Sequence, residues 1–104
     1  MDIPYGWEKF YLAVIGMAQS ARPLRQRLRD AYVNHLVYVH DENIPDGSRR
    51  DMAELHHMLT HRPPRTEREG NADASTDQMS DDEADRAARL IIKILDDLSV
   101  AKEP

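Results

Sequence analysis

Apolar side chains recur at helical spacing in four segments of this chain, which are separated by polar or breaker-rich stretches. The first segment spans residues 4–19 and the second spans residues 24–40, each with apolar positions three or four residues apart. Only residues 20–23 link them, and so short a link predicts an antiparallel helical hairpin. The spacing is carried in the first segment by Trp7, Phe10, Tyr11, Val14 and Met17, and in the second by Leu24, Leu28, Ala31, Tyr32, Leu36 and Val39.

The first predicted helix is apolar on more than one side. Leu12, Ala13 and Ile15 widen its stripe, so we expect it to lie at the centre of the fold. Asp2 stands where an N-terminal capping residue belongs. Gly16 costs about 1 kcal/mol relative to alanine inside a helix, which predicts that another helix passes close to it.

Two further helices follow. The third carries Met52, Leu55 and Leu59 on one side and ends before Pro63, which cannot continue a helix. The last begins with Ser80-x-x-Glu83, a capping box in which each residue satisfies a backbone N–H of the other. Its apolar stripe consists of Ala84, Ala87, Ala88, Ile91, Ile94, Leu95 and Leu98.

Residues 61–78, between the third and last helices, contain no aliphatic side chain larger than alanine. Such a segment has little apolar surface to bury, so we expect a mobile polar loop, although residues 72–79 could add one helical turn. A chain of 104 residues can build one modest core. The predicted fold is therefore all-α: one domain over residues 1–104, a small bundle of four helices with a long polar loop before the last.

The formal net charge of −5 is spread unevenly. Residues 1–69 hold ten Lys or Arg and ten Asp or Glu, whereas residues 70–104 hold four against nine. An acidic last helix beside a neutral, arginine-bearing body predicts that this helix docks on its own chain. The acidic total argues against general binding to nucleic acid phosphates.

The composition also excludes several classes of protein. The chain has no cysteine, so disulfides, thiolate metal sites and cysteine nucleophiles are excluded. A cysteine-free chain fits a reducing compartment, and its first residues lack the basic and apolar regions of a secretory signal, so we expect a cytoplasmic location. No apolar run approaches the roughly 20 residues that span a bilayer, so we expect no membrane partner.

Histidines at the end of the third helix are the candidate metal ligands. His57 and His61 lie one helical turn apart, as two ligands on one helix would, and His56 adjoins them. A complete site needs further ligands, and Met58 stands where zinc proteases have a glutamate after the first histidine. His61 also suits the end of a helix simply because a cation there interacts well with the helix dipole.

Arginines on the second helix form a second candidate site. Arg22, Arg25 and Arg29 recur at i, i+3 and i+7, and the guanidinium group is well suited to bind phosphate. The same side of the helix could instead be solvated, could contact a protein partner, or could dock the acidic start of the last helix. The acidic total and the lack of aromatic residues among these arginines favour such roles over nucleic acid binding.

The order of these residues resembles a family of small bacterial all-helical proteins with no assigned activity. The resemblance implies a compact helical fold and a bacterial source, and it implies no ligand, cofactor or catalytic residue. It spans most of the chain and is carried by Trp7-Glu8-Lys9-Phe10, Arg27-Leu28, Ala31-Tyr32, His35-Leu36, Ile44-Pro45-Asp46, Leu55 and Met79-Ser80-Asp81-Asp82-Glu83-Ala84.

Catalytic patterns such as a serine elbow or a glycine-rich phosphate loop are absent from the sequence. We therefore expect a non-enzymatic interaction or regulatory protein that needs no cofactor and acts through helix packing, with a protein partner or a second copy of itself. Two alternatives stay open. One is metal binding by His56, His57 and His61, and the other is a nucleic-acid-associated role for the arginines of the second helix.

Overall fold

The computed structural model describes residues 2–102, and over this range the chain is helical and contains no β-strand. The all-α prediction is confirmed. The predicted count of four helices is wrong, because a fifth α-helix lies inside the segment predicted to be a loop. The α-helices are α1 (Ile3–Gln19), α2 (Leu24–Asn34), α3 (Arg49–Thr60), α4 (Asn71–Asp77) and α5 (Asp81–Lys102), with short 3₁₀ helices η1 (Leu36–Tyr38), η2 (Asp41–Asn43) and η3 (Asp46–Ser48) before α3.

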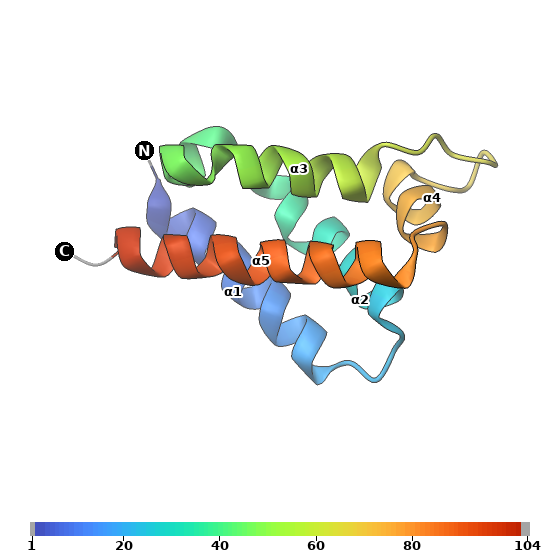
Figure 1. Cartoon of the computed structure of the whole chain (residues 1–104), viewed down its shortest axis with the longest axis horizontal. Coiled ribbons are helices and arrows are strands. Elements are labelled where there is room, and N and C mark those ends of the chain that lie inside the picture. Colours follow the sequence, from blue (N-terminus) through green and yellow to red (C-terminus); the bar gives the residue numbers. More distant parts are fainter. Residues whose placement is uncertain (1, 103–104) are drawn as a thin grey trace.

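Figure 1 shows α3 and α5 side by side and antiparallel, with α1 crossing obliquely behind α5 and α2 also passing behind α5. The short helix α4 closes one end of the molecule. The first residues of α1 and the last residues of α5 lie together at the opposite end. Helix α5 packs against α1, α2 and α3 of its own chain, so the prediction that it is a closing helix is confirmed.

The start of α1 agrees with the sequence pattern. The glycine at which another part of the chain approaches α1 closely is not the predicted one. The Asp2 carboxylate accepts the Tyr5 backbone N–H at 3.2 Å, which confirms the cap. A Cβ built on Gly16 would have no atom of another residue within 4 Å, so the predicted close helix there is wrong. The close approach is at Gly6, which is buried against the backbone of Asn43 in η2.

Helix α2 ends six residues earlier than predicted, at Asn34. The chain then tightens into η1, and Leu36 and Val39 both reach the core with 1% and 7% exposure. The β-branched residues Val37 and Val39 lower the helical preference of this stretch. Leu36 and Val39 are therefore buried as the stripe predicted, although the chain has left the α-helix and Val39 has extended backbone.

The second half of the segment 61–78 is α4, so the long loop predicted there is shortened to residues 61–70. Ala72, Ala74, Ser75 and Thr76 are buried, and the Thr76 hydroxyl donates to the Ala72 carbonyl at 2.8 Å. Small residues can pack a helix closely even without large aliphatic side chains. The helical turn suggested over residues 72–79 therefore corresponds to α4, which begins one residue earlier, at Asn71, and ends at Asp77.

The capping box at the start of α5 is present as predicted. The Glu83 backbone N–H donates to the Ser80 hydroxyl at 3.1 Å, and the Ser80 backbone N–H donates to the Glu83 carboxylate at 3.3 Å. Interactions of the Glu83 carboxylate with the Ser80 hydroxyl and with the Ser80 backbone N–H favour the ionised acid and lower the pKa of Glu83. The helix buries Ala84, Ala87, Ile91, Ile94 and Leu98 of the predicted stripe together with Leu90, whereas Ala88 and Leu95 are half-buried. None of the described helices is both long and apolar enough to cross a bilayer.

Candidate functional site

The predicted metal ligands His57 and His61 do lie side by side at the end of α3. Their rings stack with centroids 4.6 Å apart, and Nδ1–H of His61 donates to the His57 carbonyl at 2.8 Å. The Nε–H of Arg62 approaches Nε2 of His61 at 3.4 Å, so a metal at that nitrogen would compete with a guanidinium cation. Among the described residues no group of three His, Cys, Asp or Glu is arranged to hold a metal ion, and the metal site stays a prediction.

His56 points to a different place from its neighbours. Its Nδ1 lies 3.3 Å from the Tyr32 hydroxyl, and burial raises the pKa of that phenol, which keeps it protonated and able to donate. An open hollow beside this pair is lined by His56 and by the loop at residues 40–42, which carries a histidine and two carboxylates. No spacing in the sequence predicts that these residues lie together. The lining residues are Val39, His40, Asp41, Glu42, Met52, Ala53 and His56.

The candidate arginines bind groups of their own chain, and Arg22 lies in the link before α2 and not on that helix as predicted. Arg22 pairs with Asp30 at 2.6 Å. Arg25 donates to the Met79 carbonyl at 2.9 Å and also reaches the Asp81 carboxylate at 3.4 Å. The contacts of Arg25 connect α2 to the start of α5, as expected for a dock for acidic residues, whereas contact with phosphate stays a prediction.

Arg29 connects α2 to α4. Its Nε lies 2.5 Å from the Asp73 carboxylate and its Nη1 lies 3.0 Å from Asp30. The hydrogen bonds to Asp73 and Asp30 raise the pKa of Arg29, and the bond from Arg29 lowers the pKa of Asp73 despite the nearby Glu69 charge. This pair holds the short helix α4, which could not persist in isolation, in place.

We expect Asp73→Asn to loosen α4 selectively. The pair is more than a third exposed, so after solvent screening its loss should cost about 0.5–1 kcal/mol, or about 2- to 5-fold faster amide exchange in α4. Because the pKa of Asp73 is lowered, its stabilisation is present above its ordinary value of 3.8 and is lost as the pH falls through the folded-state pKa. Exchange mass spectrometry checks this, with Glu67→Gln in the loop as control; equal acceleration in α1 would contradict the assignment.

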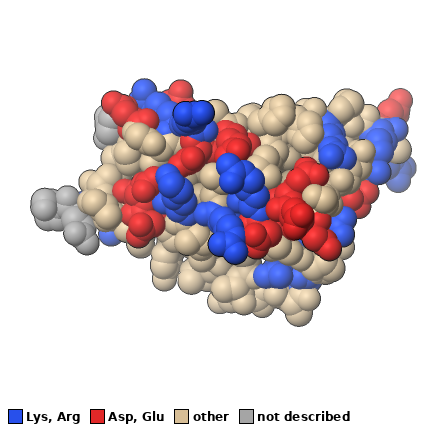
Figure 2. Space-filling view, viewed as in Figure 1, with Lys and Arg blue, Asp and Glu red and all other residues tan. Residues whose placement is uncertain are grey.

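An apolar surface, which we call the α1–α5 face, lies where α1 and α5 run together. It consists of Tyr11, Ile15 and Ala18 from α1 and Ala88 and Ile92 from α5. Tyr11 is 43% exposed and Ile92 is 53% exposed, whereas Ile15 and Ala88 are half-buried. In Figure 2 the lower part of the molecule, where α1 emerges beneath α5, is mostly tan.

A hydrogen bond between the two helices sets the register of this face. The Trp7 indole N–H donates to the Ser99 hydroxyl at 3.0 Å. In an antiparallel pair this contact places Tyr11 near residue 95 and Ile15 near residues 91 and 92. Trp7 also stacks on Tyr11 with ring centroids 4.8 Å apart, and the Lys102 ammonium lies 4.0 Å from the Trp7 ring centroid. The exposed aromatic ring of Tyr11 is therefore held in a defined position.

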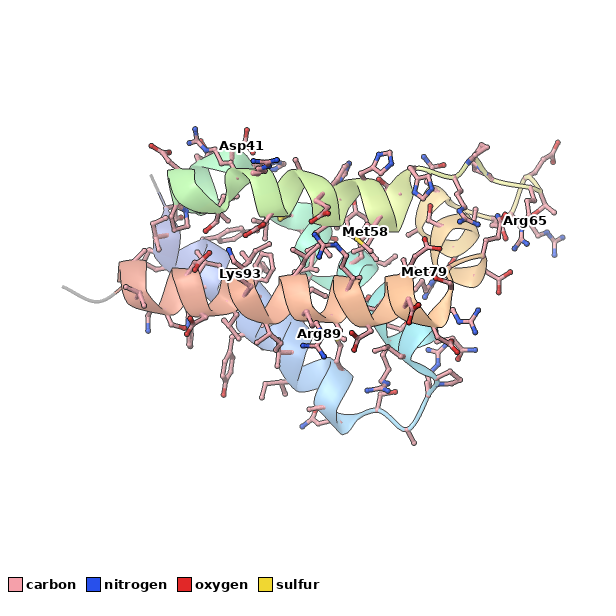
Figure 3. The ribbon with its side chains drawn as sticks, in the orientation of Figure 1. Asp41, Met58, Arg65, Met79, Arg89 and Lys93 are labelled. Carbon is pink, nitrogen blue, oxygen red and sulfur yellow. The ribbon has the colours of Figure 1, made fainter. Side chains whose placement is uncertain are left out.

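The opposite side of α5 is charged and engaged with α3. Arg86 binds Glu54 at 2.7 Å, and Lys93 binds Asp51 and also Asp97 at 3.6 Å. Figure 3 shows Lys93 toward α3 and Arg89 on the lower edge of α5. Figure 2 shows red and blue side chains together over this region, so the charged surface is largely used for packing within the chain.

The sequence contained the signal for the α1–α5 face in the wide apolar surface of α1. As predicted, α1 packs against both α5 and α2 and buries Phe10 and Ala13 in the core. Its width exceeds what the other helices cover, so Tyr11 on its outer side is exposed. Compared with known protein families, curated proteins and solved structures, the chain matches none of them, so its function is argued from this geometry.

Proposed function

We propose that this chain is a small cytoplasmic, non-enzymatic interaction protein that binds a protein partner through the α1–α5 face. The observation that carries the proposal is the exposed outer side of α1, a helix of 17 residues in which only Glu8 and Lys9 are charged. A surface helix normally presents charged and polar residues to water. An exposed apolar surface rimmed by charges is typical of a protein interaction site.

Burial energetics support this use of the face. Covering a fully exposed large apolar side chain is worth about 1.5–3 kcal/mol, and roughly half of each side chain of Tyr11 and Ile92 is still available. Trp7 restricts the Tyr11 ring before any partner arrives, so less side-chain entropy is lost on binding. A partner that covers the face would therefore gain several small contributions at a pre-ordered surface.

The geometry of the other candidate sites is less favourable for the competing roles, phosphate binding and acid–base catalysis. Arg22, Arg25 and Arg29 are held by carboxylates and a carbonyl of the same chain, and a phosphate would have to displace these groups. The hollow beside His56 is wide open, whereas acid–base catalysis works best where water is excluded. The cysteine-free sequence fits the reducing compartment that the proposal assumes.

Site-specific photo-crosslinking in the native host tests the proposal. We expect the photoreactive amino acid p-benzoylphenylalanine, placed at Tyr11 or at Ile92, to form a covalent adduct with another protein chain. The same group placed at Glu67, in the exposed loop 61–70, is the matched control and should form no comparable adduct. Absence of adducts from both positions of the face, in a chain with an unchanged circular dichroism spectrum, would overturn the proposal.

A further inference from the structure

We infer that the partner is a second copy of this chain, with the α5 helices of the two copies antiparallel across the face; the inference rests on the proposed function above. Its basis is the order of side chains along the exposed edge of α5. Ile92, 53% exposed, lies between Arg89 on one side and Asp96 on the other. Ile92, Arg89 and Asp96 line one shallow hollow together with Ala88 and Lys93.

This order is self-complementary in one orientation. When two α5 helices pack antiparallel with their centre beside Ile92, Arg89 and Asp96 lie about equally far from the centre. Arg89 of each copy then lies opposite Asp96 of the other, and two-fold symmetry repeats the ion pair. A parallel arrangement would instead place Arg89 against Arg89 and Asp96 against Asp96, so the charges select the antiparallel orientation.

The apolar residues agree with the same arrangement. Ala88 is small, which leaves room beside it for Ile92 of the second copy. Arg89 already pairs with Asp85 at 2.7 Å, but both side chains are largely exposed, at 79% and 62%. Such an exposed pair is worth little and leaves the guanidinium free to bind a second carboxylate.

The size of the face indicates a reversible dimer. Helix α1 is about 25 Å long and neighbouring helices lie about 8–10 Å apart, so the two helices present on the order of 500 Å² in projection. A standard interface buries about 800 Å² of accessible surface on each partner. The α5 edge alone is too narrow to reach this size, and Tyr11 and Ile15 of α1 supply the additional apolar area.

Charge reversal tests the inference with the full chain. Purified protein should show a concentration-dependent mass in sedimentation equilibrium that approaches twice 12.0 kDa. Arg89→Asp and Asp96→Arg should each weaken the dimer by about 10-fold or more, because two attractive pairs become repulsive. An equimolar mixture of the two variants should restore association, since both cross-copy pairs are again attractive.

Matched controls are Arg68→Asp and Glu67→Arg, which make the same charge changes in the loop 61–70 and should leave dimerisation unchanged. Circular dichroism melting shows whether each variant is folded, and if either charge reversal fails to fold, Ile92→Ser replaces it as the variant that should weaken the dimer. A mass of 12.0 kDa at every concentration overturns self-association, and failure of the mixture to recover overturns the antiparallel orientation. Adducts from Tyr11 to a different protein, with a monomeric chain in solution, would preserve the proposed function and overturn only this inference.

Discussion

Replacing Gly6 with alanine is expected to lower the free energy of unfolding by about 2–3 kcal/mol, even though alanine is the better helix former. A Cβ at this position would overlap the backbone carbonyl oxygen of Asn43 and would lie 3.2 Å from the Asn43 Cβ. The substitution should therefore destabilise the protein by overpacking the contact between α1 and η2. Chemical denaturation followed by circular dichroism measures the change.

The backbone around Asn43 has little freedom to move away from the added methyl group. The Asp2 backbone N–H donates to the Glu42 carbonyl at 3.0 Å, and the His40 N–H donates to the Asn43 side chain at 2.8 Å. Gly16→Ala is the matched control on the same helix, because nothing lies within 4 Å of its Cβ. It should raise stability by about 0.5–1 kcal/mol, and equal effects of the two substitutions would contradict this account.

Replacing Leu98 with alanine should cost about 2–5 kcal/mol of unfolding free energy. Leu98 is fully buried near the end of α5, where that helix joins the core shared with α1 and α3. The loss combines removed apolar burial with the cavity left in a closely packed interior. A single domain of this size typically has about 5–15 kcal/mol of stability, so the variant should lose a large fraction of it.

Val100→Ala provides the comparison on the same helix. Val100 is 71% exposed, so its truncation should change stability by no more than about 0.5 kcal/mol. Thermal and urea unfolding of both variants measure the contrast. If Leu98→Ala is as mild as Val100→Ala, the C-terminal part of α5 does not form the core contacts described above.

Local patterns predicted much of this fold because helix starts and apolar stripes depend on neighbours in sequence. Asp2 caps α1, Ser80 and Glu83 form their capping box, and Asp85 pairs with Arg89 as an i, i+4 pair. Each contact lies within one turn of helix, so its geometry follows from helical spacing alone. Arg86 of the same helix binds Glu54 of α3, a contact that the spacing along α5 does not predict.

Contacts between distant segments were harder to predict. The burial of Ala72 and Thr76 depends on the surfaces of α2 and α3 that receive α4. Gly6 needs to be glycine because η2 crosses α1 at that position. No spacing in the sequence reveals where this crossing lies. The grouping of His56 with the loop at residues 40–42 likewise arises only when α3 folds beside that loop.

The sequence by itself determined that the chain is helical, where α1 and α5 begin, and which of their sides need to be buried. Tertiary structure alone decided that Gly6 lies at a close crossing, that Arg29 fastens α4, and that the outer side of α1 is exposed. The physical reason is that hydrophobic periodicity specifies how much apolar surface a helix carries, whereas only the packed arrangement decides how much of it other helices cover. In this protein Tyr11 and Ile92 belong to the part that the chain does not cover, and that surface carries the proposed function.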